Sequence, residues 1–343
     1  MCATINLEKK HFPVLLNELI SIISPLYSGT FIDCTFGEGG YSKKILEHDG
    51  NKIIALDRDK SASLKAEELK KKYNNKLKFI NKKFSEISNL KIIQKDIKGI
   101  IFDLGYSTNQ IKDLKRGLSF KSKGKLDMRM GINEFSCHDV ISKMNENNLV
   151  KIFKFFGEER YSKKIARKII EIRKSKTINT EDLVKIIENT KKFKNSKINK
   201  STKVFQALRI FVNKEISELL FGLIGAFNQL PVGGVLAVVT FHSLEDKIVK
   251  FFFKSNSESK NSSRYLPEKN KNPICFKLTQ KKPITASNKE LYENPPSRSA
   301  KLRYAIKIND KCNFDKLLHK FNYLREIEEL KFEKWKNFGF LYP

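Results

Sequence analysis

Acidic side chains and a cluster of glycines stand where a parallel sheet would bind a ligand. Asp33 lies in an apolar run at 31–36, Gly37-Glu38-Gly39-Gly40 follows directly, and a second apolar run at 53–56 ends in Asp57. Glycines after a strand let a ligand approach main-chain N–H groups at a helix N-terminus. An acidic residue at the tip of the next strand suits a ribose diol. The pattern predicts a nucleotide-like ligand; the alternative is a purely structural strand–turn–helix corner.

The spacing of the glycines narrows the choice of cofactor. The dinucleotide pattern G-x-G-x-x-G needs a third glycine where Ser42 stands, and no lysine has the spacing of a phosphate-binding P-loop. The turn with Asp33 ahead of it suits S-adenosylmethionine better, because that ligand has no pyrophosphate to cradle. Asp57 is then expected at its ribose.

Three further candidates follow other strands. Phe84 comes just after a short strand expected at 77–80, in a loop, and the strand expected at 99–105 is apolar up to Asp103. The run 235–241 reads as a fully buried strand, and His242 follows it directly. Carboxyl ends of parallel strands share one sheet edge, so these residues are expected around one site.

The remaining pattern predicts a Rossmann-like α/β sheet, of the kind found in S-adenosylmethionine methyltransferases, with an inserted all-helical domain. Residues 1–106 and 202–310 are expected to form the sheet domain, and 107–201, where helical periodicity replaces strands, the insertion on the substrate side. A helix capped by Asn179 is expected in the insertion, and one long helix at 204–228 leads back to the sheet. Late strands are expected near 275–278 and 302–308, and a charged helical tail at 311–343.

Composition points to a polyanionic partner. The 343 residues carry a net charge of +29, which favours nucleic acid or an acidic surface. Lysine dominates this count, so part of it can be a solvated surface. Five cysteines without CxxC spacing predict a reducing compartment with neither zinc nor disulfides. With no apolar signal region and no run long enough to span a bilayer, a cytoplasmic protein is expected.

Ordered motifs add a family resemblance. The chain resembles the bacterial ribosomal RNA small subunit methyltransferase H family, which methylates N4 of one cytosine in 16S rRNA. The matching segments, written in one-letter code, are HFPVLL at 11–16, GEGGYS at 37–42, DRD at 57–59, DLG at 103–105, RGLSF at 116–120, LDMRM at 126–130, GEERY at 157–161, FQALR at 205–209, HSLED at 242–246 and the segment 294–303.

The resemblance implies S-adenosylmethionine as cofactor and 16S rRNA within the small subunit as substrate, with no membrane and an open choice between monomer and dimer. It places cofactor contacts on Gly39, Gly40, Tyr41, Asp57, Phe84, Asp103 and Gln110. Tyr41 stands where the family usually carries His. The segment YSTN at 106–109 replaces a more usual Val-Ser-Ser-Pro, and loss of that proline is expected to loosen the loop before Gln110.

The expected chemistry is methyl transfer to a weakly nucleophilic amine, with no metal. Asp103 is the first candidate to accept a hydrogen bond from N4, or it serves only the cofactor. His242 is the second candidate, with a strand-end cap as its structural alternative. Ser243 and Asp246 are expected to form a capping box.

Several basic residues have two interpretations. Arg129 either pairs with Asp127 or faces RNA, and Arg298, Lys301 and Arg303 either contact phosphate or belong to a strand edge. Competing functions are a methyltransferase acting on DNA or a small molecule, and an RNA-binding protein with an inactive pocket. The absence of an Asp-Pro-Pro-Tyr segment at Asp103 counts against DNA, and the intact glycines and acidic residues count against an inactive pocket.

Overall fold

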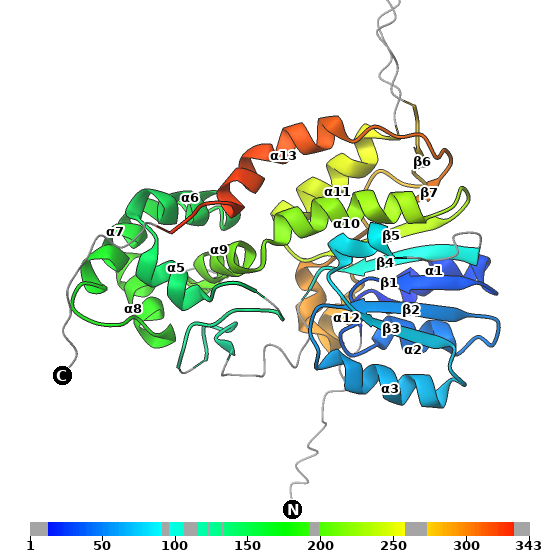
Figure 1. Cartoon of the computed structure of the whole chain (residues 1–343), viewed down its shortest axis with the longest axis horizontal. Coiled ribbons are helices and arrows are strands. Elements are labelled where there is room, and N and C mark those ends of the chain that lie inside the picture. The colour runs from blue at the N-terminus through cyan, green and yellow to red at the C-terminus, as the bar shows by residue number, and fades with distance from the viewer. Residues whose placement is uncertain are drawn as a thin grey trace, which may run out of the picture. The chain divides into compact units, whose positions relative to one another are not determined.

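The computed structural model describes residues 13–90, 96–105, 116–122, 124–131, 133–191, 199–257 and 273–332. It contains a seven-stranded sheet with the order β3-β2-β1-β4-β5-β7-β6 (Figure 1). The first five strands of the chain run parallel, and β7 runs antiparallel to β5 and β6. The predicted Rossmann-like α/β sheet is confirmed. Its strands are β1 Thr30–Asp33, β2 Lys52–Asp57, β3 Leu77–Asn81, β4 Ile97–Asp103, β5 Val235–Thr240, β6 Phe276–Lys277 and β7 Lys301–Lys307.

The chain divides into two compact units, 1–108 with 219–318 and 109–218 with 319–343. The first contains the sheet with α1 Leu16–Ile23, α2 Gly40–Leu46, α3 Ala62–Lys72, α11 Ser243–Ser255, α12 Asn288–Glu293 and the 3-10 helices η1 Ser24–Leu26, η2 Phe84–Asn89 and η5 Pro295–Ser299. The second contains α5 Cys137–Lys143, α6 Glu146–Phe156, α7 Ser162–Ile172, α8 Thr180–Thr190 and α9 Thr202–Asn213. Two helices, α10 Glu215–Gln229 and α13 Asp315–Glu328, have residues in both units.

Alternation of buried side chains places apolar layers on both faces of the sheet. On one face, Ala237 and Val239 of β5 join a core with α1, α2 and α3. On the other, Phe102 of β4 packs edge-to-face on Phe84 at 5.4 Å, and both contact Gly222 of α10, where an added Cβ would lie 2.5 Å from the Phe84 ring. All six residues of β5 are buried, as the continuous apolar run predicts.

The buried Lys307 fastens β7 to the end of α10. Its Nζ donates to the carbonyls of Phe227 at 2.9 Å and Leu230 at 2.6 Å, and lies 2.8 Å from Asp310. It also lies 4.2 Å from the centre of the Phe227 ring. A helix leaves its last carbonyls without intrahelical donors, so one ammonium group satisfies two of them here.

In the second unit, α5, α6 and α8 begin at N-termini that a side chain caps. The predicted cap at Asn179 is confirmed, because its side chain accepts the Asp182 N–H at 2.9 Å. Ser136 forms an equivalent box with Asp139 at the start of α5.

The second unit also contains a buried ion pair. The buried Glu159 pairs with Lys191, whose Nζ in turn donates to the carbonyl of Lys200 at 2.5 Å.

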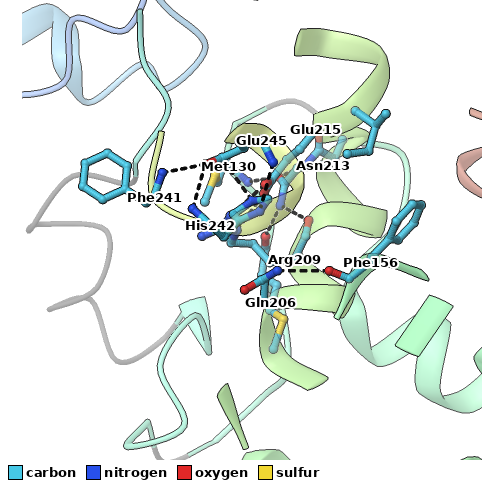
Figure 2. Close-up of polar contacts among 12 residues, drawn as sticks. Met130, Phe156, Gln206, Arg209, Asn213, Glu215, Phe241, His242 and Glu245 are labelled. Atoms are coloured by element: carbon cyan, nitrogen blue, oxygen red, sulfur yellow. Dashed lines mark hydrogen bonds and ion pairs between the residues drawn. The ribbon is translucent and has the colours of Figure 1, made fainter. Parts of the chain in front are cut away.

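The single long helix expected at 204–228 is wrong. The chain forms α9 and α10 with a break at Lys214, whose φ of 50° is left-handed. At the end of α9, the Asn213 side chain donates to Met128 O at 2.9 Å and accepts the Met130 N–H at 2.8 Å. Arg209 of α9 reaches past the break to Glu215 through two bonds of 2.8 Å (Figure 2). These side-chain contacts hold a bend that no Gly or Pro marks.

The helix in the chain's last part is α13, and it has a structural role. Its buried Glu328 accepts N–H bonds from Ile216 at 2.7 Å and Ser217 at 2.9 Å, and the Ser217 hydroxyl at 2.5 Å. A carboxylate at a helix N-terminus satisfies free donors and complements the helix dipole. Glu328 therefore caps α10 from a distant part of the sequence.

The expectation of no disulfide is wrong. Cys275 and Cys312 are bonded, with their Cα atoms 5.9 Å apart, although neither has a partner close in sequence. Cys34 and Cys137 are buried and free. Within the described part of the chain, no helix is long and apolar enough to cross a membrane.

Candidate active site

The glycine turn joins β1 to α2 in backbone geometry that other residues would strain. Gly37 has a φ of 51° and Gly39 one of 72°, in the left-handed region that favours glycine. An added Cβ at Gly39 would lie 2.7 Å from side chains of both Leu69 and Phe36. At Gly40 it would lie 2.2 Å from the Pro13 ring. Gly39 and Gly40 are thus needed because neighbouring side chains fill the space that a side chain at either position would occupy.

Asp57 holds this turn against the end of β2. Its Oδ2 accepts the Gly37 N–H at 2.7 Å, and its Oδ1 accepts the Asp59 N–H at 2.8 Å. Burial raises the pKa of Asp57, although these two bonds act in the opposite direction. Each oxygen keeps acceptor capacity, so Asp57 both shapes the turn and presents acceptors at the sheet edge.

A hydrogen-bond chain links the ends of β1 and β4. The buried Asp33 accepts the Ser42 hydroxyl at 2.7 Å and the Thr35 N–H at 3.2 Å. The Thr35 hydroxyl in turn accepts the Asp103 N–H at 2.6 Å. Sequence reasoning gave Thr35 and Ser42 no role; their signal was only their place between two acidic strand ends.

Asp103 has a free buried acceptor. Its Oδ1 has no hydrogen-bond partner among the described residues. Burial, followed by the negative charges of Asp33 and Glu245, raises the pKa of Asp103 to about 7, and burial raises that of Asp33 to about 6. A buried carboxylate oxygen without a donor is costly. It is therefore suited to a ligand that brings a donor with it.

The side chain of Tyr41 is buried in the protein interior. The residue is 3% exposed, and its hydroxyl donates to the carbonyl of Val14. Burial raises the pKa of Tyr41 well above its ordinary value, so it stays a neutral donor. Next to it in space, Glu290 accepts the Leu15 N–H at 2.8 Å. The segment just before α1 is thus tied both to α2 and to α12.

Phe84 and Gln110 are two further residues that were predicted to contact the cofactor. Phe84 opens the 3-10 helix η2 directly beyond β3, instead of lying in an irregular loop, and its ring packs on Phe102 of β4. Gln110 lies outside the described residues.

His242 caps α11 at the end of β5. Its Nδ1 accepts the Glu245 N–H at 3.4 Å, and Glu245 Oε2 accepts the N–H groups of Phe241 at 2.8 Å and His242 at 3.3 Å (Figure 2). His242 Nε2 lies 3.0 Å from Glu245 Oε1. The capping box expected for Ser243 and Asp246 is therefore wrong by one residue, because His242 and Glu245 form it. An accepting Nδ1 places the imidazole proton on Nε2.

A sequence model of the MraW methylase family matches residues 8–308. The chain belongs to this family. The ribosomal RNA small subunit methyltransferase H of Bartonella quintana is 41% identical over 310 residues, which cover 90% of this chain and 92% of that protein. The protein of the same name in Rhodopseudomonas palustris strain TIE-1 is 40% identical over 301 residues, or 87% and 91% of the two chains.

A solved structure titled as a putative rRNA-methylase from Clostridium thermocellum is 10% identical, with a TM-score of 0.40, and the match covers 88% of this chain and 99% of that one. The strand order of the sheet itself shows the Rossmann-like fold of the methylase.

The residues at the sheet edge fit S-adenosylmethionine, the cofactor of this methyltransferase. Gly39 and Gly40 form a turn that carries no side chains of its own, and Asp57 offers carboxylate oxygens to hydroxyl groups. Asp103 has the buried oxygen that awaits a donor. Together they place carboxylate acceptors beside a glycine turn, without a phosphate-binding lysine.

Of the basic residues with two interpretations, Arg129, Lys301 and Arg303 are paired with carboxylates. Asp127 binds Arg129 in a two-bond pair at 2.6 and 3.0 Å, which supports the structural interpretation of Arg129. Asp246 accepts Arg303 Nε at 2.7 Å and Lys301 Nζ at 3.0 Å. Arg303 and Lys301 thus belong to a strand-edge network, whereas Arg298 is exposed.

Proposed function

We propose that this methylase transfers a methyl group to the exocyclic N4 of a cytosine in 16S rRNA of the small ribosomal subunit. The observation that carries this proposal is the buried, unpartnered Oδ1 of Asp103 at the carboxyl end of β4, beside the glycine turn. The similarity over about nine tenths of the chain to proteins named for small-subunit RNA supports the substrate.

The cofactor would be held by Gly39, Gly40, Tyr41, Asp57, Phe84, Asp103 and Gln110. When bound, S-adenosylmethionine supplies a methyl group whose bond to sulfur breaks as its bond to N4 forms. Tyr41 contributes through its backbone, since its side chain is occupied in the core. Asp57 meets the ribose with the acceptor capacity that the turn leaves free.

Asp103 prepares the amine. The N4 lone pair of cytosine is delocalised into the ring, which makes the amine a poor nucleophile. A carboxylate that accepts an N–H bond from N4 favours the pyramidal amine and fixes its orientation toward the methyl group. The ionised form of Asp103 is the active one, and the methylated nitrogen then releases its proton to water. His242 is the second candidate for this contact, which it would make through Nδ1, the ring nitrogen that now accepts the Glu245 N–H.

The target base must leave any duplex, because N4 is engaged in Watson–Crick pairing. The helical residues 107–201 are assigned to the substrate side, with 1–106 and 202–310 as the methyltransferase domain and 311–343 as a tail. The excess of lysine fits a phosphate-rich partner. The cytoplasm remains the predicted location.

The decisive experiment uses labelled S-adenosylmethionine and small subunits that lack the modification. The label is expected on N4 of one cytosine of 16S rRNA. Asp103→Ala should lose at least a hundredfold in kcat, which corresponds to about 3 kcal/mol of transition-state stabilisation. Label on DNA or on free metabolites, with none on 16S rRNA, would overturn the proposal.

A further inference from the structure

A cationic cavity lies outside the cofactor site, between α11, the segment 278–282 and β7. It has a volume of 230 Å³. Four lysines line it, Lys250 and Lys254 from α11 and Lys281 and Lys282 from the segment. These four residues are exposed, and none of the residues that line the cavity is acidic. Four ammonium groups around one small cavity favour an anion.

A network behind the lysines builds the cavity wall. Arg303, with a side chain 11% exposed, pairs with Asp246 at 2.7 Å. Its Nη1 also donates to the Lys281 carbonyl at 3.3 Å. Burial alone raises the pKa of Asp246, but the bonds from Arg303 and Lys301 outweigh it and lower that pKa. Asp246 therefore stays charged and neutralises the arginine. Arg303 and Asp246 thus fix the wall, and the four lysines line the cavity in front of it.

The position of α11 relates this cavity to the proposed chemistry. Asp246, Lys250 and Lys254 follow one another at four-residue spacing on one face of the helix. His242 caps the same helix, and eight residues of helical rise place Lys250 about 12 Å farther along it. A base near His242 would thus have the phosphates of neighbouring nucleotides within reach of the cavity.

We infer that this cavity binds backbone phosphates of the substrate RNA next to the target nucleotide. This inference rests on the proposed rRNA substrate and specifies where the strand runs. The lysines act as point charges on phosphate, so they position the strand without reading its bases. They would raise affinity for the substrate and leave the methyl-transfer step itself unchanged.

The test removes one lysine from each wall in the full-length protein, as Lys250→Gln with Lys282→Gln. The matched control, Lys52→Gln with Lys71→Gln, removes the same charge at exposed positions on β2 and α3. Binding to unmodified small subunits is measured between 50 and 200 mM salt. Loss of two phosphate contacts with a single strand should make the plot of log affinity against log salt concentration less steep by about 1.4. From 50 to 200 mM salt, the affinity of the variant should therefore fall by a factor about seven times smaller than that of wild type. KM should rise and saturating kcat should stay.

The outcomes separate this inference from the proposed function. Equal slopes for the cavity variant and the control would show that these lysines are only a solvated surface, and would overturn the inference even if wild type methylates 16S rRNA. A reduced slope with no methylation of 16S rRNA would leave the phosphate site standing and remove the proposed function. Calorimetric loss of inorganic phosphate binding without any change in RNA slope would assign the cavity to a free anion, again overturning the inference.

Discussion

The Asp103 N–H donates to the Thr35 hydroxyl at 2.6 Å, which joins the end of β4 to the segment just beyond β1. Through Thr35 the bond continues to Asp33, whose negative charge raises the pKa of Asp103. The two acidic strand ends are therefore coupled both mechanically and electrostatically. Their coupling governs the first two predictions.

The rate should depend on the ionisation of Asp103. Since the carboxylate is the active form and its pKa is about 7, kcat should rise as pH increases through 7. Asp33→Asn removes a negative charge that raises this pKa, so the acidic limb should move to lower pH. Single-turnover rates from pH 5.5 to 9 measure it. An unchanged limb in Asp33→Asn would argue that another group controls the rate.

Asp103→Asn should stabilise the protein at alkaline pH while it loses activity. Burial raises the folded pKa of Asp103 above its ordinary value of 3.8. The native state therefore binds the extra proton, and wild type loses stability as pH rises from about 4 through 7. Asparagine carries no charge, so it should be more stable than wild type by about 1 to 4 kcal/mol at pH 8. Denaturant titrations should show this gap shrinking toward pH 4; a constant gap contradicts the assignment.

Substitutions at Asp57 should separate turn geometry from charge. Asp57→Ala removes both acceptors of the Gly37 and Asp59 N–H groups and should abolish measurable cofactor binding. Asp57→Asn keeps one acceptor oxygen, so binding should be weakened to an intermediate value. Isothermal calorimetry compares them with Asp59→Asn as control. If alanine binds the cofactor with wild-type affinity, Asp57 is not part of the site.

Tyr41→Phe should lower stability and leave cofactor affinity unchanged. The variant loses the hydroxyl bond to the buried Val14 carbonyl, which should cost about 1 to 2 kcal/mol. The backbone N–H offered to the cofactor remains. Thermal unfolding and calorimetry on the same preparations test both parts. A large loss of affinity at unchanged stability would mean that the hydroxyl itself serves the cofactor.

Lys214→Gly should stabilise the bend between α9 and α10. Lys214 adopts a left-handed conformation that glycine accepts without steric cost, so a gain of about 0.5 to 1 kcal/mol is expected. Lys214 also pairs with the exposed Glu329 at 3.1 Å, and Lys214→Ala controls for loss of that weak pair. Should glycine prove no more stable than alanine, the backbone conformation is not the source of strain.

Strand ends were the part of the site that the sequence predicted well, because continuous apolar runs stop visibly at Asp57 and Asp103 and at His242. The position of the α11 cap was not predictable, since Ser243 with Asp246 and His242 with Glu245 both have capping spacing. In the structure Glu245 forms the box with His242, while Asp246 pairs with the distant Arg303.

Contacts between distant segments account for the other differences. The break at Lys214 depends on bonds from Asn213 to the Met128 and Met130 backbone, which local propensity does not contain. The pairing of Cys275 with Cys312 depends on β6 and the chain after β7 being neighbours. The buried Glu328 was hidden in a charged segment whose amphipathic pattern is weak.

Burial of Lys307 gives the protein an internal reporter of unfolding. Its Nζ is enclosed by two carbonyls and Asp310, whereas most of the lysines that the structure describes meet solvent. An amine-reactive label applied briefly should therefore modify the exposed lysines at once and reach Lys307 only when the corner between α10 and β7 opens. Mass spectrometry of that one peptide would time the opening without any engineered probe.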